Sequence, residues 1–261
     1  MKYGVSQLSI VPGREEASDK SEMVTQVLFG EHYKIIEERS KWVKIRIALD
    51  KYECWIDRIQ AFEVSKEVYD SLENNKVWTS TTDLASIAND INSQEMIPIV
   101  MGSSLPNYEN EKSRWGENVF QYAGMTAKSD AGINRQTIVD NAEMYINAPY
   151  LWGGRSPFGI DCSGFSQLVY KIAGKKLPRD AYQQAEIGAT LSFVEEAEDG
   201  DLAFFDNEEG HIIHVGILMN ENEIIHASGK VRIDKIDHQG IFNVDTGRYS
   251  HKLRLIKKIL K

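Results

Sequence analysis

Three residues of this sequence have the types and spacing of a cysteine nucleophile with a histidine base. Cys162 opens a segment whose apolar residues recur at helical spacing: Phe165, Leu168, Val169 and Ile172. Asp161 precedes it as a helix N-cap, so the thiol lies at the positive end of the helix dipole, which favours the thiolate. We therefore expect Cys162 to be a nucleophile. The alternative is a small buried apolar residue, the commoner role of a free cysteine.

The two histidines lie in predicted strands on either side of a turn, Asn220-Glu221-Asn222. If the turn is centred on Glu221, paired residue numbers sum to about 442, which places His214 diagonal to His226 on one sheet face. His214 would then be the base and His226 the residue that orients its ring. The alternatives are structural histidines of a half-buried sheet, or a metal site with only three ligands. The other histidines are expected at the surface: His211, His238 and His251.

These residues need a scaffold of helices followed by strands. A helical stripe is predicted before Pro149, then the Cys162 helix, then a short helix after Leu177. Strands follow from Leu202 onward, which predicts an α+β domain over residues 135–261. The Gly-rich turn before Cys162 carries Trp152, which could form one wall of a cleft.

The N-terminal half reads as short strands separated by polar turns. Residues 1–65 are rich in β-branched and aromatic residues at even spacing, which predicts a small β-barrel. Residues 66–125 fit a second, degenerate barrel of the same kind, and residues 126–134 form a polar linker.

Composition limits the possible partners and compartments. The chain has 261 residues and a formal net charge of -9, which argues against nucleic acid or an anionic membrane as the main partner. Its two cysteines, Cys54 and Cys162, do not form a disulfide scaffold. Without an apolar run of signal-peptide or membrane-spanning length, a cytoplasmic location is expected. Export is the alternative, if a signal peptide has been removed.

Six motifs in order resemble the NlpC/P60 cell-wall cysteine peptidases. They are Leu151-Trp-Gly-Gly, Asp161-Cys-Ser-Gly-Phe, Leu177-Pro-Arg-Asp, Gly200-Asp-Leu, His214-Val-Gly-Ile and Ile225-His-Ala-Ser. The resemblance covers residues 135–261 and implies a papain-like fold with Cys162 as nucleophile, His214 as base and His226 as third member. The first 65 residues resemble bacterial SH3-type domains, with Cys54 where a glycine usually precedes the tryptophan.

Two SH3-like β-barrels before such a domain resemble the muropeptide-recycling branch of the family. That resemblance implies cleavage of the γ-D-glutamyl to diamino acid bond in murein peptides with a free N-terminal L-Ala, releasing L-Ala-D-Glu. It also implies that the first SH3-type domain closes one end of the cleft. The residues implied to hold the substrate are Asp161, Ser163 and Asp180, with Tyr52 and Glu16 from the SH3-type domain.

The expected protein is thus a cysteine endopeptidase that needs no cofactor and no metal. Its expected partner is a murein-derived peptide, with no nucleic acid and no membrane, and it is expected to be a monomer. Two alternatives stay open: a thiol amidase or acyltransferase on the same scaffold, and a non-catalytic peptidoglycan-binding protein.

Overall fold

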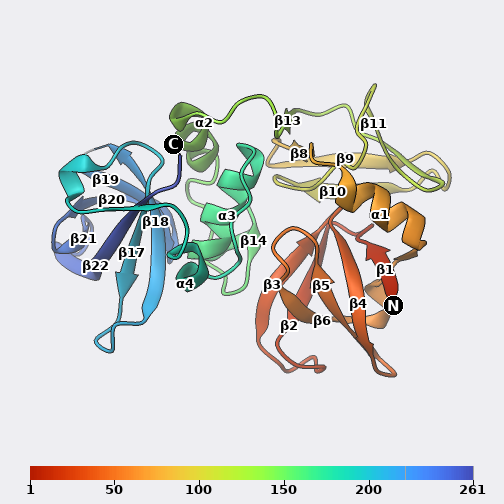
Figure 1. Ribbon diagram of the computed structural model, residues 1–261, viewed down its shortest axis with the longest axis horizontal. Helices are drawn as coiled ribbons and strands as arrows, with labels where there is room; N and C mark the ends of the chain where they lie inside the picture. The colour runs from red at the N-terminus through yellow and green to blue at the C-terminus, as the bar shows by residue number, and fades with distance from the viewer. Residues whose placement is uncertain (221, 261) are drawn as a thin grey trace.

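The computed structural model describes residues 1–220 and 222–260 and contains three sheet-based units (Figure 1). The first unit is an antiparallel sheet in the order β3-β2-β6-β5-β4-β1-β7, which curls into a small barrel. Its strands are β1 Lys2–Val5, β2 Ile10–Arg14, β3 Met23–Leu28, β4 His32–Glu38, β5 Trp42–Ile47, β6 Glu53–Asp57 and β7 Glu63–Val64. The 3₁₀-helix η1 Arg58–Gln60 links the last two strands. The alternating burial of β4 and β5 gives the barrel one apolar interior.

The second unit begins with helix α1, Lys66–Asn74, and continues in two small sheets. One has the order β10-β9-β12-β11 and the other pairs β8 with β13. The strands are β8 Thr79–Thr81, β9 Ala85–Asp90, β10 Met96–Val100, β11 Lys112–Trp115, β12 Asn118–Gln121 and β13 Thr126–Lys128. Ser65 caps α1 by accepting from the Val68 N–H, a start signal that the sequence interpretation missed. That this unit is a degenerate SH3-like domain stays a prediction.

The third unit packs helices on a closed sheet. Helices α2 Arg135–Glu143, α3 Cys162–Ile172 and α4 Ala181–Gln184 precede most of its strands, as the α+β prediction requires. The sheet order is β16-β22-β17-β18-β19-β20-β21, and an additional β21–β22 pairing closes the last six strands into a ring. Its strands are β16 Ala189–Leu191, β17 Leu202–Asp206, β18 Ile212–Asn220, β19 Glu223–Ser228, β20 Lys230–Asp237, β21 Gly240–Asn243 and β22 Arg248–Lys258. The short hairpin β14 Arg155–Ser156 and β15 Gly159–Ile160 leads into α3, and η2 Val194–Glu196 follows β16.

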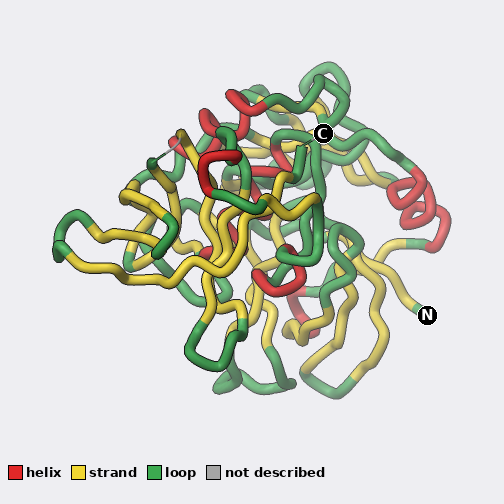
Figure 2. Tube along the Cα trace, turned by 60° about the vertical axis from the view of Figure 1, so that its left-hand side comes forward, coloured by secondary structure: helices red, strands yellow, loops and turns green. Residues whose placement is uncertain are grey.

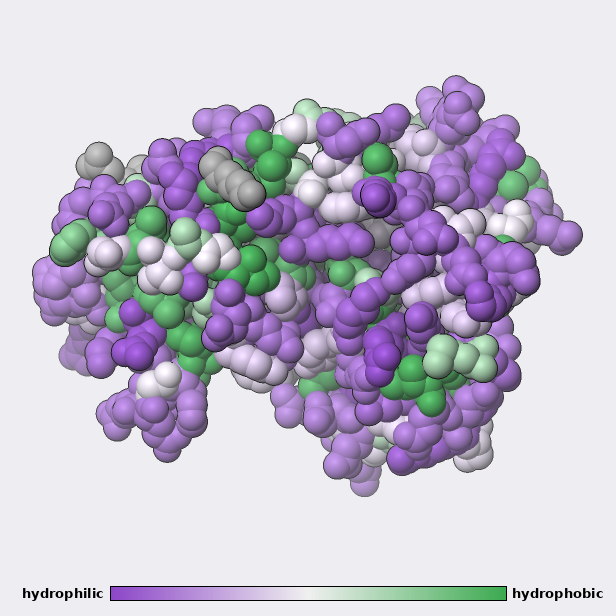
Figure 3. Space-filling view, in the orientation of Figure 1, coloured by the Kyte–Doolittle hydropathy of each residue, from purple (hydrophilic) through white to green (hydrophobic). Residues whose placement is uncertain are grey.

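Helix α3 is buried along its whole length, because it lies between the ring and the N-terminal units (Figure 1). Strands and loops make up most of the chain in Figure 2, and the face seen in Figure 3 is largely hydrophilic. The largest apolar core joins α2 and α3 to one side of the ring, with Phe165, Leu168 and Val215 fully buried. No helix among the described residues is long and apolar enough to cross a bilayer.

A buried ion-pair cluster holds the first unit against the third. Glu31 accepts from Arg155 through two bonds of 2.9 Å and from Lys171 at 2.8 Å. These three side chains have at most 2% of their surface exposed. Glu31 is the anion that both cations share, so the two units are fixed together by charged residues that neither could bury alone.

One detail differs from the sequence interpretation. Strand β13 lies inside residues 126–134, predicted as a linker, because its backbone groups complete a two-stranded sheet with β8. The centre of the predicted hairpin turn, Glu221, lies outside the described residues. Cys54 and Cys162 are both free and buried, so the expectation of no disulfide scaffold agrees with the described structure.

Candidate active site

Cys162 is the first residue of α3, and the local sequence explains why the helix begins there. The Asp161 carboxylate accepts from the Gly164 N–H at 2.7 Å, as an N-cap does. The backbone N–H groups of Val215 and Ser163 lie near the Cys162 sulfur, where they act to lower the pKa of its thiol. Val215 follows His214 in β18, so the helix start and the histidine strand meet at the sulfur.

The resting thiol is not a preformed thiolate. Burial, followed by the nearby Asp161 charge, raises the pKa of Cys162 to about 12 despite the helix dipole and the two N–H donors. No Cys162–His214 hydrogen bond is present in the part of the chain that the structure describes. The N–H groups near the helix start favour the thiolate, as expected, but burial of the sulfur outweighs them in the resting site. A base must take the proton as the reaction begins.

A chain of hydrogen bonds determines which nitrogen of His214 can act as that base. His226 Nε2 lies 3.1 Å from the Asp234 carboxylate, and His226 Nδ1 lies 2.8 Å from His214 Nε2. Hydrogen bonds from His226 and Arg232 lower the pKa of Asp234 to about 2 against the effect of burial, so this carboxylate is ionised and only accepts. In neutral His226 the proton is therefore on Nε2, and Nδ1 accepts from His214 Nε2–H. This leaves the lone pair of His214 on Nδ1, free to receive a proton.

The strand register brings these histidines together as the sequence interpretation expected. Gly216 pairs with His226 and Ile217 with Ile225, so paired residue numbers sum to 442 on either side of the turn. His214 and His226 consequently share a face, and their rings meet edge to face with centroids 5.1 Å apart. Both side chains are buried.

His251 does not lie at the surface on its own, contrary to the expectation. Its ring stacks on His214, with centroids 4.1 Å apart and planes 21° apart. Strand β22 returns beside β17, which in turn pairs with β18, and this closure of the sheet could not be read from sequence spacing. Burial and the neighbouring His226 lower the pKa of His251 to about 4. The ligand atoms of the three histidines lie within 4.8 Å of one another, but stacked rings direct their in-plane lone pairs side by side rather than toward one point.

A cleft of about 640 Å³ opens in front of Cys162. Its lining includes five of the predicted substrate-binding residues, which are Tyr52, Trp152, Asp161, Ser163 and Asp180. Residues that the sequence interpretation missed also line it: Glu15, Glu22, Val24, Tyr150, Arg179, Ala181, Tyr182, Ile212 and Ile213. The cleft thus lies between the first barrel and the catalytic unit.

Asp161 and Ser163 reach the cleft, but their polar groups are already engaged within the protein. Besides the helix cap, Asp161 accepts from the Gly153 N–H at 2.9 Å and from two nitrogens of Arg179 at 3.0 and 2.5 Å. Ser163 Oγ accepts from Arg179 at 2.9 Å. Arg179 is 1% exposed, so the charges of Arg179 and Asp161 offset each other beneath the cleft.

Asp180 and Tyr52 form a pair across the two units. The Tyr52 hydroxyl lies beside the Asp180 carboxylate. Burial raises the pKa of Asp180, and the Arg179 charge and the neighbouring Tyr52 work against that rise. The carboxylate therefore faces the cleft with capacity for a further donor.

Glu16, predicted to contact substrate, lies outside the cleft, and Glu15 and Glu22 line it instead. The physical reason is the hairpin between β2 and β3. The Glu15 N–H donates to the Glu22 carbonyl at 3.0 Å, so these two residues oppose each other across the hairpin, whereas Glu16 lies one residue further into the loop. Glu22 also accepts a hydrogen bond from the Trp152 indole, which fixes that wall of the cleft.

A glycine allows this close approach. Gly153 has φ of +75°, and a Cβ there would lie 2.2 Å from the carbonyl oxygen of Met23 in the barrel. Only a residue without a side chain satisfies both the backbone conformation and the contact.

The chain is similar to known proteins in both parts. Residues 147–248 match the NlpC/P60 family, and residues 13–59 match the bacterial dipeptidyl-peptidase Sh3 domain. The catalytic unit is an NlpC/P60 cysteine peptidase domain.

Relatives are similar in sequence to this chain over most of its length. A Bacillus subtilis protein named gamma-D-glutamyl-L-lysine dipeptidyl-peptidase is 29% identical over 218 residues, covering 78% of this chain and 71% of the relative. Dipeptidyl-peptidase 6 of Lysinibacillus sphaericus is 26% identical over 256 residues, covering 84% and 86%. A solved NlpC/P60 family protein from Bacillus cereus has the same fold, with a TM-score of 0.81 and 18% identity, covering 99% of this chain and 100% of that one.

The geometry of the NlpC/P60 domain suits nucleophilic attack by a neutral pair. Burial, His226 and His251 hold the pKa of His214 well below 6.5, so the imidazole is neutral at neutral pH and can accept the proton of the Cys162 thiol. The catalytic roles of Cys162, His214 and His226 stay predictions that this arrangement supports.

Residue spacing alone could not identify two residues of the site, Asp234 and His251. Asp234 is eight residues from His226 and meets it only because β19 and β20 pair, with His226 opposite Arg232. An acidic residue at the same face of the next predicted strand was the available clue. His251 needed the ring closure, which no local pattern indicates.

Proposed function

We propose that this NlpC/P60 peptidase hydrolyses the γ-D-glutamyl to diamino acid bond of murein peptides with a free N-terminal L-Ala, releasing L-Ala-D-Glu. The observation that carries the proposal is the charge of the cleft. Glu15, Glu22 and Asp180 line it, and Arg179, the one cation among the described residues that line it, is already paired with Asp161. An acidic pocket beside the nucleophile suits a free ammonium group of the substrate.

The position of the barrel supports recognition of a short peptide end. Tyr52 reaches Asp180, and the Trp152 indole donates to Glu22, so side chains of both units meet on one side of the cleft. A substrate that places its N-terminus there has little room for a further residue or sugar. The names of the relatives, which specify γ-D-glutamyl-L-lysine bonds, point to the same class of substrate.

The proposed reaction uses the residues in fixed roles. His214 Nδ1 takes the Cys162 proton as the sulfur attacks the γ-carbonyl of D-glutamate, and the amide bond breaks when His214 returns that proton to the leaving amine. Water then cleaves the thioester with His214 again as base. The Cys162 N–H, at the start of α3, is a donor for the developing oxyanion.

The same proposal includes the protein's setting. We propose a monomer with a murein-derived peptide as its partner, acting in the cytoplasm on peptides already released from the wall.

Mass spectrometry of products from three substrates tests the proposal. The substrates are the free tripeptide L-Ala-γ-D-Glu-diamino acid, its N-acetylated form and the sugar-linked peptide. We expect release of L-Ala-D-Glu from the first alone, and no turnover by Cys162→Ala. Equal cleavage of the N-acetylated peptide would overturn the claim for a free amine. A cleaved sugar–peptide amide with an intact γ-linkage would instead favour the amidase alternative.

A further inference from the structure

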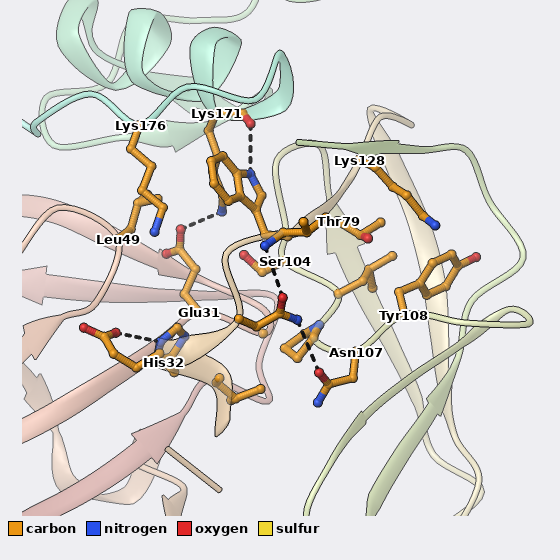
Figure 4. Close-up of a pocket in the computed structure, with 18 of the residues that line it drawn as sticks. Glu31, His32, Leu49, Thr79, Ser104, Asn107, Tyr108, Lys128, Lys171 and Lys176 are labelled. Carbon is orange, nitrogen blue, oxygen red and sulfur yellow. Dashed lines mark hydrogen bonds and ion pairs between the residues drawn. The ribbon is translucent and has the colours of Figure 1, made fainter. Parts of the chain in front are cut away.

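Helix α3, which begins with the nucleophile, carries a buried polar stripe formed by Ser163, Gln167 and Lys171. These residues are four apart, so they lie one above the other on one side of the helix. Lys171 donates to Glu31 of the barrel at 2.8 Å, and Figure 4 shows this contact beside the cavity where the three units meet. Ser163 accepts from Arg179 at the cleft end of the stripe. Gln167 therefore lies between the cleft and the ion-pair cluster.

The Gln167 amide donates to two segments of the chain at once. Its Nε2 lies 2.8 Å from Asp50 Oδ2 in the barrel and 3.1 Å from the Leu177 carbonyl oxygen in the NlpC/P60 domain. A primary amide has two N–H groups, so each has its own acceptor. Gln167 is fully buried, and loss of either bond would leave a polar group without its partner inside the protein.

Both acceptors lead directly to the cleft. The other oxygen of Asp50 accepts from the Tyr52 N–H at 2.9 Å. Leu177 is followed by Pro178, whose fixed φ stiffens the short segment that ends at Asp180. Tyr52 and Asp180 lie beside each other in the cleft, one on each of the two units. A single buried amide of the catalytic helix is thus connected to both members of this pair.

We infer that Gln167 is a positioning residue for the end of the cleft that receives the substrate's N-terminus. It sets the separation of Tyr52 from Asp180, and thereby the space and the carboxylate that a free ammonium would meet. Its effect on substrate binding rests on the proposed function, whereas its connection to Tyr52 and Asp180 does not.

Gln167→Met tests the inference because it keeps an unbranched side chain of similar size but removes both donors. KM for the free tripeptide should rise about tenfold while kcat changes by less than about threefold, since Cys162 and His214 keep their own contacts. Asp50→Ala should raise KM to a similar degree. The double variant should raise it no further, because both substitutions break the same connection.

Gln26→Met is the matched control. Gln26 is also a buried glutamine between the barrel and the NlpC/P60 domain, where its Oε1 accepts from the Arg155 N–H at 2.7 Å. This bond leads to neither Asp50 nor Leu177, so the variant should leave KM unchanged even if it lowers stability.

Amide hydrogen exchange measured by NMR gives a second result that does not require hydrolysis. Relative to the amides of β5 in the barrel core, the Tyr52 N–H should exchange at least about tenfold faster in Gln167→Met than in Gln26→Met. The reason is that Asp50, which accepts from this N–H, loses its bond to α3 only in the first variant.

The outcomes separate this inference from the proposed function. An unchanged KM in Gln167→Met, or an equal rise in Gln26→Met, overturns the inference even if the tripeptide is hydrolysed as proposed. Equal Tyr52 exchange in the two variants also overturns it. If the unmodified protein hydrolyses no tripeptide, the proposed function is wrong, and the exchange rates alone decide whether Gln167 positions Tyr52.

Discussion

His251 lies flat against His214, with ring centroids 4.1 Å apart, while His226 meets the same ring edge-on. The Phe205 ring lies on another side of the His214 ring, with ring centroids 5.7 Å apart. His214 is therefore held by rings on several sides, and its single free nitrogen has a fixed direction.

The stacking predicts different results for two substitutions of His251. His251→Ala removes the stacked ring, and kcat/KM should fall about three- to tenfold, as expected for an aromatic pair worth about 0.5–1.5 kcal/mol. His251→Phe keeps a ring and should retain most activity. Both variants should move the acid limb of the kcat/KM pH profile upward, since each removes a group that lowers the pKa of His214. Equal loss in both variants would contradict a positioning role.

The hydrogen-bond chain predicts that Asp234→Asn reduces kcat by up to about 10⁴-fold, the size seen when the carboxylate of a catalytic triad is neutralised. An amide no longer fixes the His226 proton on Nε2, so His214 loses its defined tautomer. Steady-state kinetics with the free tripeptide measure the effect. Asp245→Asn is the control, because Asp245 also pairs with Arg232 but is largely exposed. If both variants behave alike, the tautomer argument is wrong.

The lowered pKa of His214 predicts activity below pH 6.5. Burial disfavours the imidazolium, so the base stays neutral until the pH falls below its lowered pKa, and the acid limb of kcat/KM should have its midpoint below 6.5. The same shift reduces stability in acid, because the unfolded chain takes up a proton near pH 6.5 that the folded chain does not. A midpoint at or above 6.5 would show that His214 is more solvated than this structure has it.

The glutamates of the β2–β3 hairpin offer a matched pair. Glu22→Gln removes a cleft carboxylate and should raise KM for the free tripeptide severalfold with a smaller effect on the N-acetylated peptide. Glu16→Gln changes the same residue type outside the cleft and should leave KM unchanged. Initial rates over a range of substrate concentrations provide the comparison. A larger effect at Glu16 would restore the original sequence interpretation.

Glu31→Gln should lower the free energy of unfolding by about 3–5 kcal/mol, because it leaves Arg155 and Lys171 buried without their anion. Urea denaturation at neutral pH measures the loss. The surface glutamate Glu53, which pairs with Arg46, is the control, and Glu53→Gln should cost about 0–1 kcal/mol. Because the two cations lower the pKa of Glu31, its contribution is present above its ordinary pKa of 4.5 and is lost as the pH falls below that value.

The sequence could predict those features that depend on local patterns. The apolar spacing after Cys162 identified α3, and the turn between two strands determined the register that unites His214 with His226. Turn chemistry and helix capping act over a few residues, so their signals survive without knowledge of the fold.

Features that depend on distant pairings were beyond such reasoning. Asp234 and His251 reach the site through strand pairings and the closure of the sheet, and the choice of Glu22 over Glu16 depends on one hairpin register. The burial of the Cys162 sulfur, which raises the pKa of its thiol, is also a tertiary property that the helix-start signal does not contain.

Glu31 of the barrel pairs with Arg155 and Lys171 of the NlpC/P60 domain, so this domain cannot be moved into another protein without the barrel. A fusion protein that carried the NlpC/P60 domain without the barrel would expose Arg155 and Lys171 without their anion. It would also leave the cleft open on one side. A barrel exchanged to change specificity would therefore have to keep a carboxylate at the position of Glu31.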